Sequence, residues 1–145
     1  MTYAIQSDIS DRYGDEALYR VADRDRNEVL DAEAIERALV DATAEVDTYL
    51  SQRYVVPLDP VPRVVVRLVV DIAFYRLAQS AEALTDEIRQ RYDDAIALLL
   101  HMAKGVVGLG EGATETAAGG EVKGDILAPS NPARLFTRNK MRGLP

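Results

Sequence analysis

The chain has 145 residues, 48% hydrophobic and 28% charged, which is the balance of one folded soluble domain with room for a tail. It has no cysteine, which excludes a disulfide framework and thiolate chemistry. Its 24 acidic and 17 basic residues give a formal net charge of −7. This charge argues against ordinary binding of duplex DNA, which relies on Lys and Arg to neutralise phosphates.

Two short helices are predicted near the N-terminus. Ser7 can cap the first, Asp8 favours its positive end, and Gly14 can end it. The second covers 16–22, with Leu18 on its buried side. The opening residues, MTYAIQSD, contain no basic region and no long apolar run, so we expect no signal peptide.

The polar loop that follows partly matches the calcium-binding loop of an EF-hand. Its oxygen-bearing candidates are Asp23, Asp25, Asn27 and Asp31, and calcium prefers several oxygen ligands within one turn. However, Glu28 stands where the sharp turn needs glycine, and Ala34 stands where the bidentate glutamate belongs. The same side chains could instead form turns and cap helices. A calcium-responsive helical binding module is therefore kept as an alternative function.

Two long helices are predicted around a proline-rich turn. Asp31 caps the first, whose apolar residues recur at steps of three and four, as Ile35, Leu39, Ala42, Val46 and Leu50. The prolines at 57, 60 and 62 prevent this helix from continuing. The second helix starts at Pro62 and is apolar on nearly all faces from 64 to 78, which predicts a central helix with neighbours on most sides. This run is too short and too charged to span a bilayer, which needs about 20 apolar residues.

A third long helix is predicted from its cap, Thr85, to Lys104, where Gly105 can end it. Its apolar stripe is Ile88, Tyr92, Ile96 and Leu99. The three longer helices and the two short ones predict an all-α fold, a small helical bundle.

Composition changes after the third long helix. Seven glycines between 105 and 124 predict a flexible linker, so the expected division is a helical domain over 1–110 and a linker with a docking tail over 111–145. Residues 1–125 have a net charge of −11, whereas 126–145 have four basic residues and no acid. Such a tail, with Arg134, Phe136 and Arg138, could dock on an acidic neighbour, including another copy of the chain. The alternative is a solvated terminus.

Little in the sequence supports catalysis. The one histidine, His101, lies within a helix, and neither a Ser–His–Asp set nor a phosphate-binding glycine loop has recognisable spacing. We expect no enzymatic activity and no cofactor. Three charged residues are instead candidates for partner binding: Arg53, Arg67 and Asp71. Arg67 and Asp71 are four residues apart, so they could pair within one helix or reach a second subunit, since unpaired buried charge is costly.

Several segments, taken in order, resemble the small head–tail connector (neck) proteins of Mu-like phages and prophages. The most specific is 38–62, with the pattern AlxDAxxEVDxYLxxRYxxPLxxVP. Ile9-x-x-Arg12-Tyr13-Gly14 is similar to the opening helix and turn of that family, and Arg91-Tyr92-Asp93-x-Ala95-Ile96 to its third helix. Arg134-x-Phe136-Thr137-Arg138 is similar to its closing motif.

The resemblance implies a structural protein of the virion, located at the head–tail junction and made in the cytoplasm of a bacterial host. Copies would form a homo-oligomeric ring that contacts the portal protein and the tail or head-completion proteins. DNA would pass through the ring without specific binding, which an acidic channel wall would favour by repelling phosphates. The segment 8–47, with thirteen acids and five bases, is a candidate for that wall. No membrane partner is implied.

Overall fold

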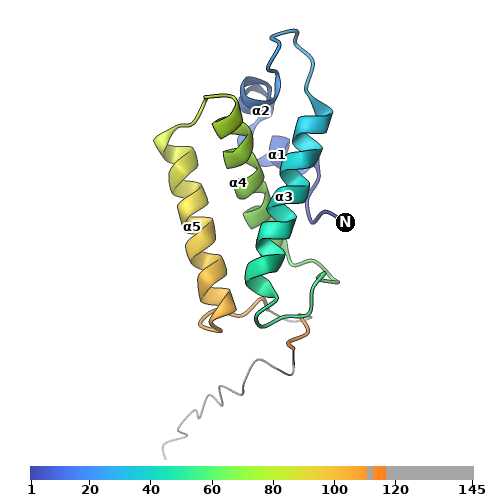
Figure 1. Cartoon of the computed structure of the whole chain (residues 1–145), viewed down its shortest axis with the longest axis vertical. Coiled ribbons are helices and arrows are strands. Elements are labelled where there is room, and N and C mark those ends of the chain that lie inside the picture. Colours follow the sequence, from blue (N-terminus) through green and yellow to red (C-terminus); the bar gives the residue numbers. More distant parts are fainter. Residues whose placement is uncertain (111–112, 117–145) are drawn as a thin grey trace, which may run out of the picture.

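The computed structural model describes residues 1–110 and 113–116, which form five α-helices. These are α1 (Gln6–Tyr13), α2 (Asp15–Ala22), α3 (Ala32–Leu50), α4 (Arg63–Ser80) and α5 (Asp86–Ala103). The three long helices lie side by side, and the two short helices pack on α4 (Figure 1). The predicted all-α bundle is confirmed.

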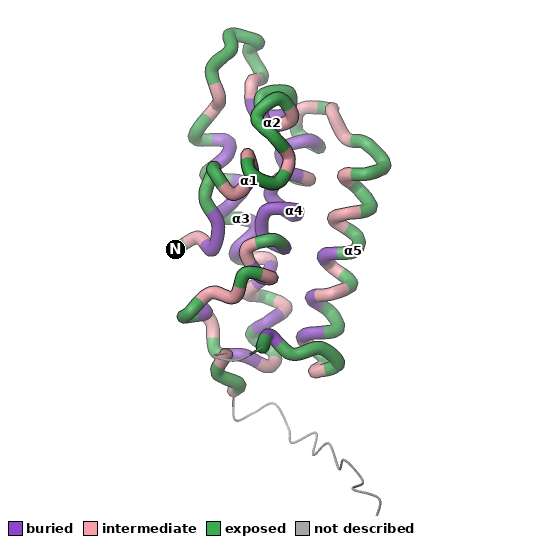
Figure 2. The backbone as a smooth tube through the Cα atoms, turned by 180° about the vertical axis from the view of Figure 1, so that it is seen from behind, coloured by how far each residue is buried: buried purple, intermediate pink, exposed green. Residues whose placement is uncertain are grey.

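Helix α4 is the centre of the bundle, as its continuous apolar character predicts. It contacts each of the other four helices. Its buried residues include Val65, Leu68, Ile72 and Phe74, and the tube in Figure 2 is coloured as buried along much of this helix. None of the helices in the described part of the chain is both long enough and apolar enough to cross a membrane.

Three helix ends follow from local sequence. The side chain of Asp31 accepts a hydrogen bond from the Ala34 amide at the start of α3, and Thr85 does the same for Ile88 at the start of α5. Gly14, with a φ of 87°, lies between α1 and α2, and its amide donates to the Ser10 carbonyl.

The predicted cap of the first helix was wrong. Ser7 lies inside α1, which begins at Gln6. Asp8 stabilises this end instead, because its carboxylate accepts a hydrogen bond of 2.8 Å from the Ile5 amide.

The proline-rich turn and the segment after α5 meet at one end of the bundle. The amide of Val55 donates to Thr114, and the amide of Thr116 donates to Arg53, so that Tyr54 and Glu115 form an antiparallel bridge. Leu109 is buried nearby. Residues 113–116, assigned from sequence to the linker, thus lie against the helical domain.

The N-terminal segment is fixed to the bundle through Tyr3. The Tyr3 hydroxyl donates to Asp47 at 2.5 Å and accepts from the Leu58 amide at 2.9 Å. Burial, followed by the hydrogen bond to Asp47, raises the pKa of Tyr3 to about 12. The first residues therefore join α3 to the proline-rich turn.

Candidate interaction site

Asp71 is a buried carboxylate on α4, 4% exposed, and α1 supplies its partners. Nε of Arg12 donates to Oδ1 at 2.6 Å, Nη2 of Arg12 donates to Oδ2 at 2.8 Å, and the Tyr13 hydroxyl donates to Oδ1 at 2.7 Å. The hydrogen bond to Asp71 also raises the pKa of Arg12. The predicted partner Arg67 is exposed, and α1 rather than α4 itself neutralises Asp71.

Tyr13 connects this ion pair to α4 and α5. Its ring stacks on Phe74 with 3.8 Å between ring centres, and the guanidinium of Arg91 lies 4.9 Å from the centre of the Tyr13 ring. Arg91 also pairs with Glu87 at 2.7 Å. Burial and the hydrogen bond to Asp71 raise the pKa of Tyr13 well above its usual range, so its hydroxyl remains a donor at all physiological pH values.

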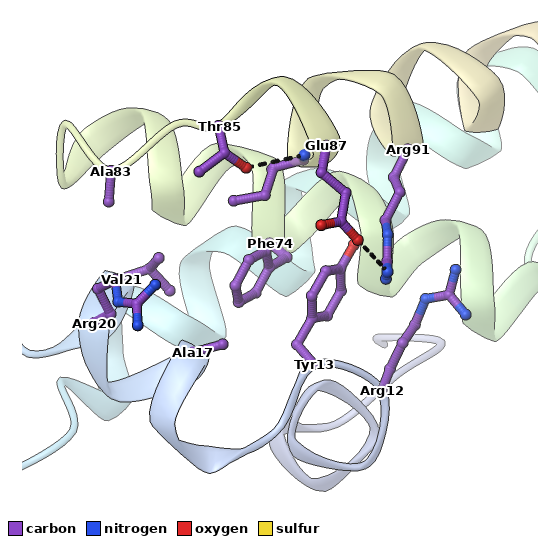
Figure 3. A pocket seen from close by; sticks show the side chains of 11 residues that line it. Arg12, Tyr13, Ala17, Arg20, Val21, Phe74, Ala83, Thr85, Glu87 and Arg91 are labelled. Carbon is purple, nitrogen blue, oxygen red and sulfur yellow. Dashed lines mark hydrogen bonds and ion pairs between the residues drawn. The ribbon is translucent and has the colours of Figure 1, made fainter.

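Two cavities adjoin this cluster. The larger, of about 270 Å³, is lined by residues of α1, α2, α4 and α5, and Figure 3 shows Arg20 at one end of it and Arg12 and Arg91 at the other. The smaller, of about 170 Å³, shares Arg12 and Arg91 and adds Arg67, Asp71 and Asp94. We call the two cavities together the arginine groove; its arginines are Arg12, Arg20, Arg67 and Arg91.

A second, partly exposed network joins the three long helices. Glu45 of α3 accepts from Arg76 of α4 at 2.6 Å and from the Tyr92 hydroxyl of α5 at 3.1 Å. The rings of Tyr75 and Tyr92 stack with 4.1 Å between centres. Burial, followed by the charge of Glu45, raises the pKa of Tyr92 to about 12. This network holds the bundle together.

Arg53, a predicted partner-binding residue, makes contacts within the chain. It forms an ion pair of 3.0 Å with Glu115, beside the bridge of residues 113–116. Gly105, with a φ of 75°, lets the chain after α5 pass close to the Arg53 guanidinium, because a β carbon at this position would collide with it. Arg53 therefore fixes the chain where it leaves the bundle.

The oxygens of the EF-hand-like loop are used in turns and in a helix cap. Asp23 accepts from the amides of Asn27 and Glu28, and Asn27 accepts from the amide of Val29. Asp31 caps α3, and Asp25 is exposed. Across residues 1–110 and 113–116, no three His, Cys, Asp or Glu side chains are placed to hold a metal ion.

The remaining predicted site residues are placed as follows. His101 is exposed in the last turn of α5. The tail residues Arg134, Phe136 and Arg138, together with most of the predicted linker, lie outside the described residues.

Sequence reasoning missed the arginine groove. Arg12, Tyr13 and Arg91 appear in the family-like motifs, but periodicity assigns them no contact, and Arg20 has no signal at all. The available signal was Asp71, because a carboxylate amid an apolar helix needs a partner from another element. Only the tertiary structure shows which element supplies that partner.

Comparison with known proteins supports the sequence resemblance. A family model described as "Bacteriophage Mu, Gp36" matches residues 3–125. The Mu-like prophage FluMu protein gp36 of Haemophilus influenzae is 37% identical over 108 residues, which cover 74% of this chain and 75% of that protein. Gene product J of Escherichia phage Mu is 32% identical over 105 residues, covering 72% of each chain. The chain therefore belongs to the bacteriophage Mu Gp36 family of Mu-like phage and prophage proteins.

Proposed function

We propose that this protein is a structural subunit of the virion, a head–tail connector that forms a ring between portal and tail around the DNA channel. The observation that carries the proposal is the match of residues 3–125 to a phage Mu family, a range that includes the connector-like motifs at 9–14, 38–62 and 91–96. The role itself comes from the resemblance to Mu-like connectors.

The chemistry of the described residues supports a structural role. The buried carboxylate of Asp71 is neutralised by Arg12, Glu45 is held by Arg76, and the loop oxygens bind backbone amides. These side chains hold helices together and do not converge on a common reacting atom. We expect no catalytic activity.

The charge of the protein suits a DNA channel. With a net charge of −7, the chain as a whole repels phosphates, which would let DNA pass without being held. The basic tail would then contact an acidic neighbouring subunit rather than DNA, through Arg134, Phe136 and Arg138.

The decisive experiment removes the gene from the phage or prophage that carries it. We expect filled heads and complete tails that do not join, seen by electron microscopy, and joined particles when a plasmid supplies the intact gene. Joined, infectious particles without the gene would contradict the connector role.

The tail is tested in the same complementation assay. A chain ending at Gly124 is expected to fold with an unchanged helical circular dichroism spectrum but to leave heads and tails apart. The matched control is the full-length chain with Lys140→Ala, which removes one tail charge outside the Arg134–Arg138 motif. Full complementation by the truncated chain would contradict tail docking.

A further inference from the structure

The arginine groove differs in charge from the rest of the domain. Its lining contains four arginines and three carboxylates, Asp71, Glu87 and Asp94. The other described residues contain 18 acids and 8 bases. The groove is therefore a weakly positive site on a strongly acidic body, and it favours an anionic occupant.

Two of the four arginines are available to such an occupant. Arg20 and Arg67 are exposed at the two ends of the groove, and neither forms an ion pair with a described residue. Arg12 and Arg91, between them, are held in place by Asp71 and Glu87. The groove therefore offers the guanidinium groups of Arg20 and Arg67 to an occupant, while Arg12 and Arg91 are held by their ion pairs.

The outer face of α3 carries the complementary charge. Its exposed positions recur at helical spacing and include Glu33, Glu36 and Asp41, with the partly exposed Val40 (48%) between them. Arg37 lies within this stripe, four residues from both Glu33 and Asp41, so the three acids and one base give the stripe a net charge of −2. Its ion pair with Glu33, at 3.8 Å, is so exposed that it contributes almost nothing. We call these outward positions the acidic stripe.

The acidic stripe is shorter than the groove. The groove lining on α5 runs from Glu87 to Leu98, and the stripe runs from Glu33 to Asp41. At 1.5 Å per residue they span roughly 17 Å and 12 Å, so the stripe can lie within the groove. In Figure 1, α5 and α3 lie on either side of α4, and the two helices also contact each other.

We propose that the arginine groove receives the acidic stripe of α3 from a second copy of this chain. The inference rests on the homo-oligomeric assembly of the proposed function and assigns its subunit contact. Because two different surfaces meet, the contact is heterologous and repeats from copy to copy, which generates a closed ring or an open filament.

Charge argues against two other occupants. The chain's own residues 126–145 contain four bases and no acid, so the groove arginines repel them. Duplex DNA would also meet the rest of the domain, whose 18 acids outnumber its 8 bases and oppose the binding of phosphates.

The test measures molar mass by light scattering over a concentration series of the full chain at low salt. The wild-type chain should self-associate with a dissociation constant below about 1 mM. Arg20→Glu/Arg67→Glu should raise this constant by about 10-fold or more, because like charges then face each other. The matched control is Arg63→Glu/Arg89→Glu, which makes the same charge change at exposed arginines of α4 and α5 outside the groove. It should weaken association by no more than about 3-fold.

A charge swap identifies the occupant. Glu33→Arg/Glu36→Arg should also weaken self-association, and mixing this variant with Arg20→Glu/Arg67→Glu should restore it, since each reversed surface then meets its complement. A wild-type monomer up to about 1 mM would overturn the proposal. So would equal effects of the groove and control variants, or a mixture that stays monomeric.

Two further measurements test whether the tail or DNA, rather than the acidic stripe, is what the groove or the chain binds. Association that is lost in the chain ending at Gly124 but unchanged in Arg20→Glu/Arg67→Glu would assign the contact to the tail alone. Duplex DNA binding that is lost in the groove variant would assign the groove to phosphates. Either result overturns the proposal. Particle assembly in the gene-deletion assay is read separately, so the connector role and this contact can fail independently.

Discussion

Replacing Arg12 with Met tests whether α1 is held to α4 by a buried charge. Breaking a buried ion pair by removing one partner costs about 3–5 kcal/mol, because the other charge is left without compensation. Here the Asp71 side chain is 6% exposed and that of Arg12 is 32% exposed. Water can reach the Arg12 side, and Tyr13 still donates to Asp71, so we expect the low end, about 3 kcal/mol.

A second variant removes the carboxylate charge of Asp71 that Arg12→Met leaves without a partner. Adding Asp71→Asn to Arg12→Met keeps an acceptor for the Tyr13 hydroxyl but no buried carboxylate, so the total loss should shrink to about 1–1.5 kcal/mol. Urea unfolding followed by circular dichroism measures each free energy of unfolding. Arg89→Met, at an exposed arginine of α5 that forms no ion pair with a described residue, is the control and should change stability by less than about 0.5 kcal/mol. A loss in Arg12→Met no larger than that control, or no recovery in the double variant, would refute the reasoning.

Three other outcomes are expected. Asp31→Ala should lower the free energy of unfolding by about 1 kcal/mol through loss of the α3 cap, and an unchanged urea midpoint would exclude that role. The pKa values of Tyr3 and Tyr92 are about 12 in the folded protein, whereas an unfolded tyrosine loses its proton near pH 10. Their contribution to stability is therefore complete below pH 10 and is lost between about pH 10 and 12; urea midpoints that stay constant up to pH 11.5 would contradict this. Gly105→Ala should cost about 1–2 kcal/mol, because its φ is 75° and its β carbon meets Arg53, and should speed amide exchange at the bridge; native exchange rates would contradict the account.

The helices were predictable because their signals are local. Gly14, Asp31 and Thr85 mark helix ends by their own backbone and capping chemistry. The apolar spacing of α3 gives its buried face directly, whereas in the predicted stripe of α5 only Leu99 is buried and the other residues are partly buried. The start of α1 was the exception, because Ser7 and Asp8 both offer an oxygen there and only the three-dimensional path of Ile5 selects Asp8.

The interaction site could be predicted only in part. Asp71 was identified as a charge in need of a partner, but its partner Arg12 lies 59 residues earlier, and helical spacing points only to neighbours such as Arg67. The groove depends on how α1, α2 and α5 are placed around α4, and no periodicity within one helix specifies that placement. The match to the phage Mu Gp36 family identifies the family of the chain but does not specify these contacts.

The central position of α4 also has a consequence for how the chain is made. Ile9 of α1 and Leu18 of α2 are fully buried in the folded domain, and both short helices pack on α4, which is synthesised later. At about 5–20 residues per second, residues 1–22 leave the ribosome roughly 3–12 s before the end of α4 does. During that time the apolar residues of these two helices have nothing to cover them, so the first 22 residues are the part of the chain on which we expect a chaperone of the host cell to act.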